Sequence, residues 1–185
     1  IVPVGDDQRQ HVEITRDIAE RFNSRYGETF VVPAHVIPPA GARVMDLQHP
    51  TRKMSKSEEG AGTVNVLEDP ASIEKKFKRA VTDSESEVRY DVDDKPGVSN
   101  LLSILGAATG RSPDAVAGDY SQYGPLKADT AEAVITLLEP IQARFAELRD
   151  DPAETQRLMA LGAAKAQAIA SGVLARAKEN IGLLS

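Results

Sequence analysis

The chain has 185 residues, of which 41% are hydrophobic and 27% charged, so it is long enough to bury a core as one ordinary domain or two small ones. It contains no cysteine, which excludes disulfides and thiolate metal sites, and its scattered histidines, His11, His35 and His49, do not predict a zinc site. The net charge of −6 argues against a protein whose main role is to coat nucleic acid, although it allows a local basic patch. No apolar run approaches the roughly 20 residues of a membrane span and nothing resembles a signal peptide, so we expect a cytoplasmic protein with no membrane segment.

The first 45 residues predict a piece of an α/β sheet. Residues 1–4 form an apolar run typical of a short buried strand, and residues 5–7 turn it into a helix with an aspartate as its cap. Residues 29–32 and 42–45 predict two more short strands. Because a buried parallel strand needs neighbours on both sides, we expect the chain to begin in the middle of a domain. The helix between the first two strands is marked by apolar residues at helical spacing and by a glycine stop: Val12, Ile14, Ile18, Ala19, Phe22, Tyr26 and Gly27.

From residue 69 onward the sequence predicts only helices, after an exposed polar loop at residues 46–64. The long amphipathic pattern at residues 125–148 contains Pro140, which should kink or divide the helix. The predicted fold class is therefore an α/β remnant at residues 1–57 followed by an all-α helical bundle at residues 58–185. Proline-containing start signals mark the other helices: Asp69-Pro70, Pro96-Gly97, Ser112-Pro113 and Asp151-Pro152.

The strongest chemical signal is the pentamer at residues 53–57, Lys-Met-Ser-Lys-Ser. Two lysines and two serines on a Gly-flanked loop supply ammonium and hydroxyl donors suited to a polyphosphate. Lysine is a compact charge on a flexible stem, so such a loop can follow a leaving group as it moves. By composition alone, such a pentamer is more often a solvated basic loop.

A second candidate is the turn at residues 3–8, Pro-Val-Gly-Asp-Asp-Gln, where the first strand gives way to a helix. Gly5 lets a ligand approach the backbone, and the start of the helix offers fixed amide dipoles. Ligands of open α/β sheets bind beyond the carboxyl ends of the strands, which is where this turn is expected. By itself, a Gly-Asp-Asp turn is more often a plain helix start.

Both segments resemble signatures of one enzyme family. The pentamer matches the KMSKS signature of class I aminoacyl-tRNA synthetases, and residues 3–8 resemble the PVGEDQ motif of the tryptophanyl-tRNA synthetases, with Asp6 where glutamate is common. Tyrosyl enzymes tend to carry a different sequence ahead of their Asp-Gln pair, which favours the tryptophanyl family. The resemblance continues through residues 10–17, 25–27, 80–84, 95–97 and 140–142, and so covers nearly the whole chain.

The resemblance implies a Rossmann-like catalytic domain at residues 1–57 and a helical anticodon-binding domain with a carboxy-terminal helix at residues 58–185. It also implies that tryptophan and ATP are substrates, that Mg²⁺ accompanies the ATP, and that tRNA(Trp) is the acceptor. Lys53, Ser55 and Lys56 would be the catalytic donors to the β- and γ-phosphates. The full set implied to bind ATP is Gly5, Asp6, Asp7, Val44 (through its backbone), Lys53, Met54, Ser55, Lys56 and Ser57. The residues implied to border the tryptophan pocket are Val2, Val4 and Gln8.

The HIGH-type motif that this family pairs with KMSKS does not occur in the sequence, and the family's acidic residue for the indole N–H is expected upstream of Ile1. We therefore expect this chain to hold only the KMSKS side of the active site, to be inactive alone, and to belong to a homodimer when intact. A tyrosyl or other class I enzyme, and a non-catalytic tRNA-binding fragment, are the alternatives. A basic cluster either contacts tRNA or is a solvated helix face: Lys75, Lys76, Lys78 and Arg79.

Overall fold

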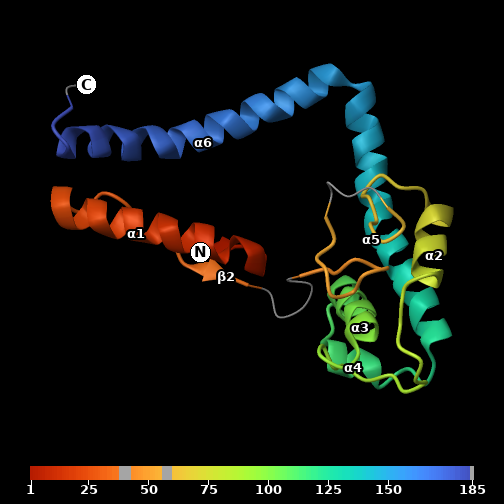
Figure 1. Ribbon diagram of the computed structural model, residues 1–185. Helices are drawn as coiled ribbons and strands as arrows, with labels where there is room; N and C mark the ends of the chain where they lie inside the picture. The colour runs from red at the N-terminus through yellow and green to blue at the C-terminus, as the bar shows by residue number, and fades with distance from the viewer. Residues whose placement is uncertain (38–42, 56–59, 184–185) are drawn as a thin grey trace. The chain divides into compact units, whose positions relative to one another are not determined.

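The chain folds into two compact units, which share the long helix α5 (Figure 1). The computed structural model describes residues 1–37, 43–55 and 60–183. Unit 1 comprises Ile1–Ile37 and Phe145–Ser185, and unit 2 comprises Pro38–Arg144. The elements in chain order are β1 (Val2–Pro3), α1 (Arg9–Tyr26), β2 (His35–Val36), α2 (Pro70–Lys78), α3 (Pro96–Thr109), α4 (Pro113–Ala117), α5 (Tyr123–Asp150) and α6 (Pro152–Asn180), with a 3₁₀ turn at Asp6–Gln8.

Unit 1 contains a strand–helix–strand motif. Strands β1 and β2 are parallel, with Val2 opposite His35 and Pro3 opposite Val36, and α1 is the crossover between them. This confirms an α/β element at the start of the chain. The expected burial of the first strand is wrong in this chain, because Ile1 is 92% exposed and Val2 37% exposed.

The second strand lies later than residues 29–32, where the sequence predicts it. Asn23, near the end of α1, accepts hydrogen bonds from the backbone N–H groups of Thr29 (3.1 Å) and Phe30 (2.9 Å) and donates to the carbonyl of Phe30 (2.7 Å). These backbone groups are thereby taken from any ladder, and Pro33 has no N–H to give. Strand pairing begins only beyond that proline.

Helix α1 ends as predicted but does not begin as predicted. Gly27 has φ +94° and its N–H bonds the carbonyl of Asn23, which fits a glycine stop. The expected aspartate cap is wrong, because Gly5 precedes the 3₁₀ turn and Gln8 holds the N-cap position of α1. Asp6 instead forms an exposed ion pair with Arg9 (3.3 Å).

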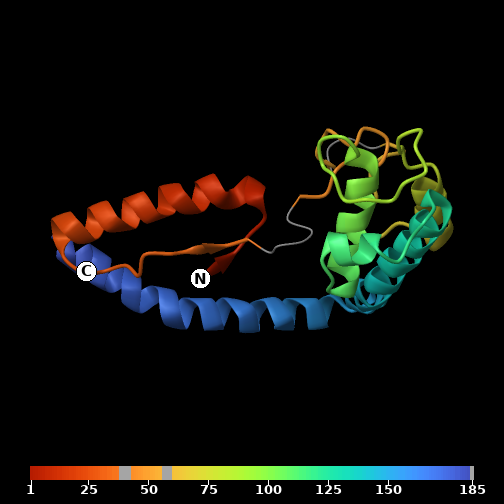
Figure 2. The same ribbon diagram turned by 90° about the horizontal axis from the view of Figure 1, so that it is seen from below.

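Helix α6 returns to the end of α1 within unit 1, as both views show (Figures 1 and 2). Asn180 donates a hydrogen bond to the hydroxyl of Thr29 (2.6 Å), and Ala177 is buried nearby on the same helix. By length and composition alone, α6 is apolar enough to cross a membrane, contrary to the sequence expectation. The reason is its many alanines, which raise the mean hydropathy although Lys165 and Gln167 interrupt every long apolar run. Core helices of other proteins pass the same criterion.

Unit 2 has a continuous hydrophobic core built around α3. The core side chains come from α2, α3, α4 and α5 and from the segment before the KMSKS loop, and each large one contributes about 1.5–3 kcal/mol on burial. The principal members are Leu47, Ile73, Phe77, Val98, Leu101, Leu102, Val116 and Leu126. Asp69 and Ser112 cap their helices and Gly110 (φ +71°) ends α3, all as predicted. Helix α5 runs through Pro140 without a break, so the expected division is wrong.

The two units do not coincide with the boundary expected at residues 57 and 58. The segment at residues 43–55 contributes Leu47 to the core of unit 2, and the last helix lies in unit 1 with α1. The fold is mostly helical, with one two-stranded parallel sheet. The assignment of catalytic and anticodon-binding roles to the two predicted domains stays a prediction.

Candidate active site

The KMSKS segment is one arm of an antiparallel hairpin in unit 2. Met54 donates its N–H to the carbonyl of Val44 (3.0 Å), and Asp46 donates its N–H to the carbonyl of Arg52 (2.8 Å). Met45 and Lys53 lie directly opposite each other between these bonds. The predicted third strand, residues 42–45, is therefore a single bridge whose partner is the signature itself; Ala42 lies outside the described residues.

This hairpin brings Val44 next to the signature, as a shared ATP site requires. Val44 and Met54 pack against the core of unit 2, and they line an apolar cavity of about 260 Å³ with residues of α3 and α5. Lys53 is exposed and Ser55 half-buried. Lys56 and Ser57, also predicted to bind ATP, lie outside the described residues.

The turn of the hairpin is fixed by Asp46. Its carboxylate accepts hydrogen bonds from the N–H groups of Gln48 and His49, both at 2.8 Å. Gly62 presses against the same carboxylate so closely that any side chain there would clash with it. Leu47 donates its N–H to Gly62 (2.9 Å) and accepts from Val81 (2.8 Å). The hairpin is thus tied on both sides into unit 2.

The hairpin is also joined to α3 by a residue that the sequence reasoning did not single out. Asn100, 5% exposed, accepts a hydrogen bond from the N–H of Met45 (2.9 Å) and donates one to the carbonyl of Met45 (2.8 Å). The only sequence signal was a lone amide in the apolar start of a helix, Val-Ser-Asn-Leu-Leu.

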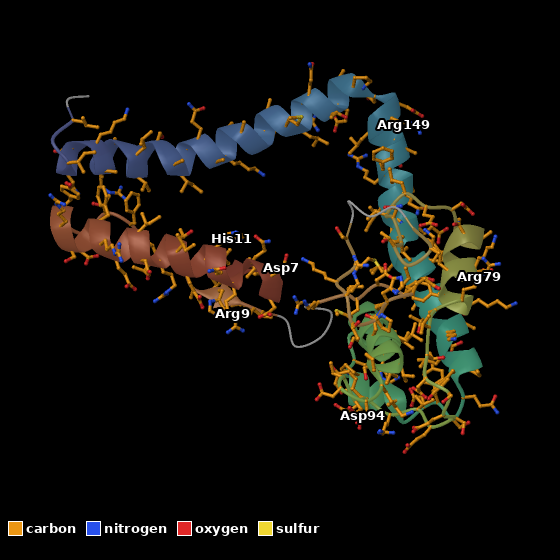
Figure 3. All side chains as sticks on the ribbon, in the orientation of Figure 1. Asp7, Arg9, His11, Arg79, Asp94 and Arg149 are labelled. Carbon is orange, nitrogen blue, oxygen red and sulfur yellow. The ribbon has the colours of Figure 1, made fainter. Side chains whose placement is uncertain are left out.

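The loop after the signature is held by two further side chains. Lys76 donates to the carbonyl of Thr63 (2.6 Å) and pairs with the carboxylate of Glu68 (2.6 Å). Burial raises the pKa of Glu68, but hydrogen bonds from Lys76 and Ser72 outweigh it and hold that pKa below its usual range. Gln142 of α5 donates to the carbonyls of Val66 (2.8 Å) and Glu68 (3.0 Å). Lys76 therefore has a structural partner, whereas Lys75, Lys78 and Arg79 of the predicted basic cluster are exposed on α2 (Figure 3).

Two of the motifs behind the family resemblance meet at a buried lysine. Lys95, 1% exposed, contacts the carboxylates of Asp83 (3.1 Å) and Glu85 (2.7 Å) and the hydroxyl of Tyr123 (3.1 Å). Tyr123 donates to Asp83 (2.6 Å). Burial raises the pKa of Asp83, but the hydrogen bonds from Tyr123 and Lys95 outweigh it, so the net pKa is lowered. The partners of this lysine lie inside unit 2, so the geometry indicates a structural lock.

The other predicted ligands lie in unit 1, at the start of α1 (Figure 3). Gln8 donates to the carboxylate of Asp7 (3.1 Å), and its amide oxygen lies 2.9 Å from Nδ1 of His11. Gln8 is therefore oriented by residues on both sides, and it is exposed. Val2 and Val4 follow β1 to the same turn as Gly5. The structure groups these residues with one another, while the hairpin belongs to unit 2.

The chain resembles known proteins along its full length. The family described as tRNA synthetases class I (W and Y) matches residues 1–139. Tryptophan–tRNA ligase 1 of Streptomyces avermitilis is 53% identical over 184 residues, which cover 99% of this chain and 56% of that protein. The crystal structure of tryptophanyl-tRNA synthetase from Mycoplasma pneumoniae is 31% identical with a TM-score of 0.88, covering 98% of this chain and 56% of the other.

A third similar protein was crystallised with ligands. The tryptophanyl-tRNA synthetase of Campylobacter jejuni, complexed with ADP and tryptophan, is 30% identical with a TM-score of 0.63, and the match covers 98% of this chain and 56% of the other. The chain thus spans a little over half the length of these relatives. With a family match over residues 1–139, the chain belongs to the class I tRNA synthetases of the tryptophan and tyrosine group.

Proposed function

We propose that this chain forms the KMSKS side of the active site of a cytoplasmic tryptophan–tRNA ligase. The observation that carries the proposal is the hairpin in which Lys53 and Met54 pair with Met45 and Val44. A lysine–serine pentamer on a solvated loop has no reason to be paired, anchored to a core and set against a second predicted ATP ligand. The 53% identity to a tryptophan–tRNA ligase adds the amino acid.

The reaction would proceed in two steps. The carboxylate of tryptophan attacks the α-phosphate of ATP, so that an acyl–phosphate bond forms and the bond to pyrophosphate breaks. A terminal hydroxyl of tRNA(Trp) then attacks the acyl carbon, the ester forms and AMP leaves. No protein nucleophile is needed, so catalysis consists of positioning and of stabilising charge in the transition state.

Lys53 and Lys56 would neutralise the charge that builds on departing pyrophosphate, with Ser55 as a hydroxyl donor. The donors of the described hairpin arm are an ammonium and a hydroxyl, which suit phosphate oxygens. Within residues 1–37, 43–55 and 60–183 there is no group of three His, Asp or Glu side chains that could hold a metal ion. We therefore assign Mg²⁺ to the phosphates of ATP, where it would offset their charge.

The start of α1 would supply the other contacts, with Gly5, Asp6 and Asp7 near the ribose and Val2, Val4 and Gln8 at the tryptophan pocket. The hydrogen bonds of Gln8 to Asp7 and His11 support this role, since they orient its amide before a ligand arrives. The related enzyme from Campylobacter jejuni binds ADP and tryptophan together, as this assignment requires.

The remaining part of the enzyme would complete a Rossmann-like sheet. Two parallel strands with exposed apolar residues, Ile1 among them, are the kind of fragment that further strands would cover. We infer that this part carries the HIGH-type motif, precedes Ile1, and contributes to a homodimer. The chain by itself is then inactive.

The test compares this chain with a completed enzyme, meaning this chain preceded by the amino-terminal part of the Streptomyces avermitilis relative. Exchange of labelled pyrophosphate into ATP is measured with tryptophan and, separately, with tyrosine; the full-length relative is the positive control. We expect tryptophan-dependent exchange from the completed enzyme and background exchange from the chain alone. Exchange that requires tyrosine would transfer the proposal to the tyrosyl enzymes. A folded but inactive completed enzyme that still binds tRNA would favour a non-catalytic tRNA-binding fragment.

A further inference from the structure

We propose that Asn100 is a positioning residue that sets the place of the KMSKS signature from behind; the inference rests on the proposed function. Asn100 lies on α3, 55 positions from Met45 in the sequence, and contacts both polar atoms of the Met45 backbone. It does not touch the signature itself. Its action would pass through Met45 to Lys53, which lies directly opposite.

The hydrogen-bond pattern of the hairpin explains why an amide is needed at this point. The bonds between the two arms join Val44 to Met54 and Asp46 to Arg52, so Met45 and Lys53 form the non-hydrogen-bonded pair between them. In such a pair, the N–H and C=O of Met45 point away from Lys53, toward the position of a neighbouring strand. Asn100 takes that position, because its side-chain amide offers one acceptor and one donor in the arrangement of a peptide group.

This contact fixes the register of the hairpin. A slip of one residue would turn every side chain of the signature to the opposite face. With its amide bound to one backbone residue, Asn100 allows a single register, because Met45 must present its N–H and C=O to α3. The neighbouring core residues Leu101 and Leu102 are fully buried, so the anchor itself cannot drift. Small errors in the position of a catalytic group are costly, with about a hundredfold loss for a shift of about 1 Å.

Other contacts of the hairpin have different targets. Asp46 and Leu47 hold the turn, and Lys76 and Gln142 hold the loop that follows. Asn100 instead binds the arm that pairs with Lys53. Its loss is therefore expected to disturb adenylate formation more than its contribution to stability would suggest.

The experiment uses the completed enzyme and the variant Asn100→Asp, which keeps the size and the acceptor but loses the donor to the carbonyl of Met45. Ser99→Ala is the matched control: Ser99 is the preceding residue of the same helix, 2% exposed, and its hydroxyl accepts one hydrogen bond, from the N–H of Asp91 (2.8 Å). We expect Asn100→Asp to lower the single-turnover rate of adenylate formation by at least about tenfold, with the affinity for tryptophan within about twofold of wild type. Ser99→Ala should leave both values within about twofold.

A double-mutant cycle separates positioning from a general structural role. If Asn100 acts through Lys53, Asn100→Asp should cost much less in a Lys53→Ala background than in the wild type; effects that multiply would overturn the inference. Backbone hydrogen exchange in residues 44–55 supplies a readout that does not need activity, and it should accelerate in Asn100→Asp but not in Ser99→Ala. A wild-type completed enzyme without exchange of pyrophosphate would reject the proposed function, whereas unchanged hydrogen exchange at residues 44–55 would reject the role of Asn100.

Discussion

The two units differ in how well each buries its own apolar residues. Unit 2 has a core that includes Phe77, Leu101 and Leu126, each at most 1% exposed. In unit 1, the described residues Val12, Ala19 and Ala177 are buried, but they are small or medium-sized. Large apolar side chains of unit 1 remain exposed instead, among them Ile1, Ile14, Ile18, Val31, Met159, Ile169 and Leu174.

The difference indicates that unit 2 is a folding unit in its own right, while unit 1 is one layer of a larger structure. Contiguous apolar surface on this scale is unusual for a protein on its own and marks a place where other structure packs. The relatives, of which this chain spans 56%, provide enough additional chain to supply it. The signature loop belongs to the unit that is already stable, which fits a site whose phosphate-binding half is preformed.

The largest effect should come from paired phenylalanine substitutions in the two units. Phe77→Ala in the 185-residue chain is expected to lower the free energy of unfolding by about 3–5 kcal/mol, because it removes a fully buried ring and leaves a cavity. The control Phe145→Ala, at a side chain that is 44% exposed in unit 1, should cost less than about 1 kcal/mol. Urea unfolding followed by circular dichroism measures both. Equal losses would show that unit 1 has a core of comparable quality.

Almost as large an effect is expected for Lys56→Ala in the completed enzyme, although this residue lies outside the described part of the chain. Removing one donor to developing charge should lower the rate of adenylate formation by about a hundredfold or more, equivalent to roughly 3–4 kcal/mol. The loss should fall on the rate constant, because the donor engages the leaving group more in the transition state than in the ground state. The stability of unit 2 should not change. A normal single-turnover rate with weaker ATP binding would show that this lysine serves ground-state binding only.

The helices were predictable from sequence because their signals are local. Asp69, Ser112 and Asp151 cap their helices through their own side chains, and Gly27 and Gly110 end theirs with positive φ. The strands were less predictable because their partners are distant or unusual. The apolar stretch at residues 29–32 loses its backbone groups to Asn23, and residues 42–45 pair with a basic segment whose composition does not suggest a strand.

The candidate site was predictable only in part. The two signatures named Val44, Lys53 and the turn at Gly5, but nothing in the sequence shows that Val44 and Met54 share a hydrogen bond. Asn100 was missed because a side chain that binds a backbone 55 positions away leaves no periodic trace. Lys76 was grouped with its exposed neighbours because composition cannot distinguish a lysine paired with Glu68 from a solvated one.

A smaller effect is expected from acid, and it should fall on unit 2. The folded-state pKa values of Asp83 and Glu68 lie below their ordinary values of 3.8 and 4.5. The native state therefore binds fewer protons than the unfolded state, so this stabilisation is complete above about pH 4.5 and is lost as pH falls through the folded-state values. Thermal unfolding midpoints should drop more steeply below pH 4.5 in wild type than in an Asp83→Asn/Glu68→Gln variant, which is less stable at pH 7 but less sensitive to acid. Parallel profiles would remove both carboxylates from the acid response.

The smallest effect concerns the basic residues of α2 and whether unit 2 meets tRNA through them. Because Lys76 is engaged by Glu68 and Thr63, its substitution would disturb the loop after the signature, so the informative variant is Lys75→Ala/Lys78→Ala. If both exposed lysines contact phosphates, tRNA binding by the completed enzyme should lose a slope of roughly 0.7–0.9 per contact in a plot of log affinity against log salt concentration. Lys127→Ala serves as a control, since this lysine lines a groove with α2 but its pKa is lowered by burial. The acidic net charge of the chain makes such local contacts necessary for any approach to a polyanion. Unchanged affinity and slope in the double variant would leave these lysines as a solvated helix face and place the tRNA surface elsewhere.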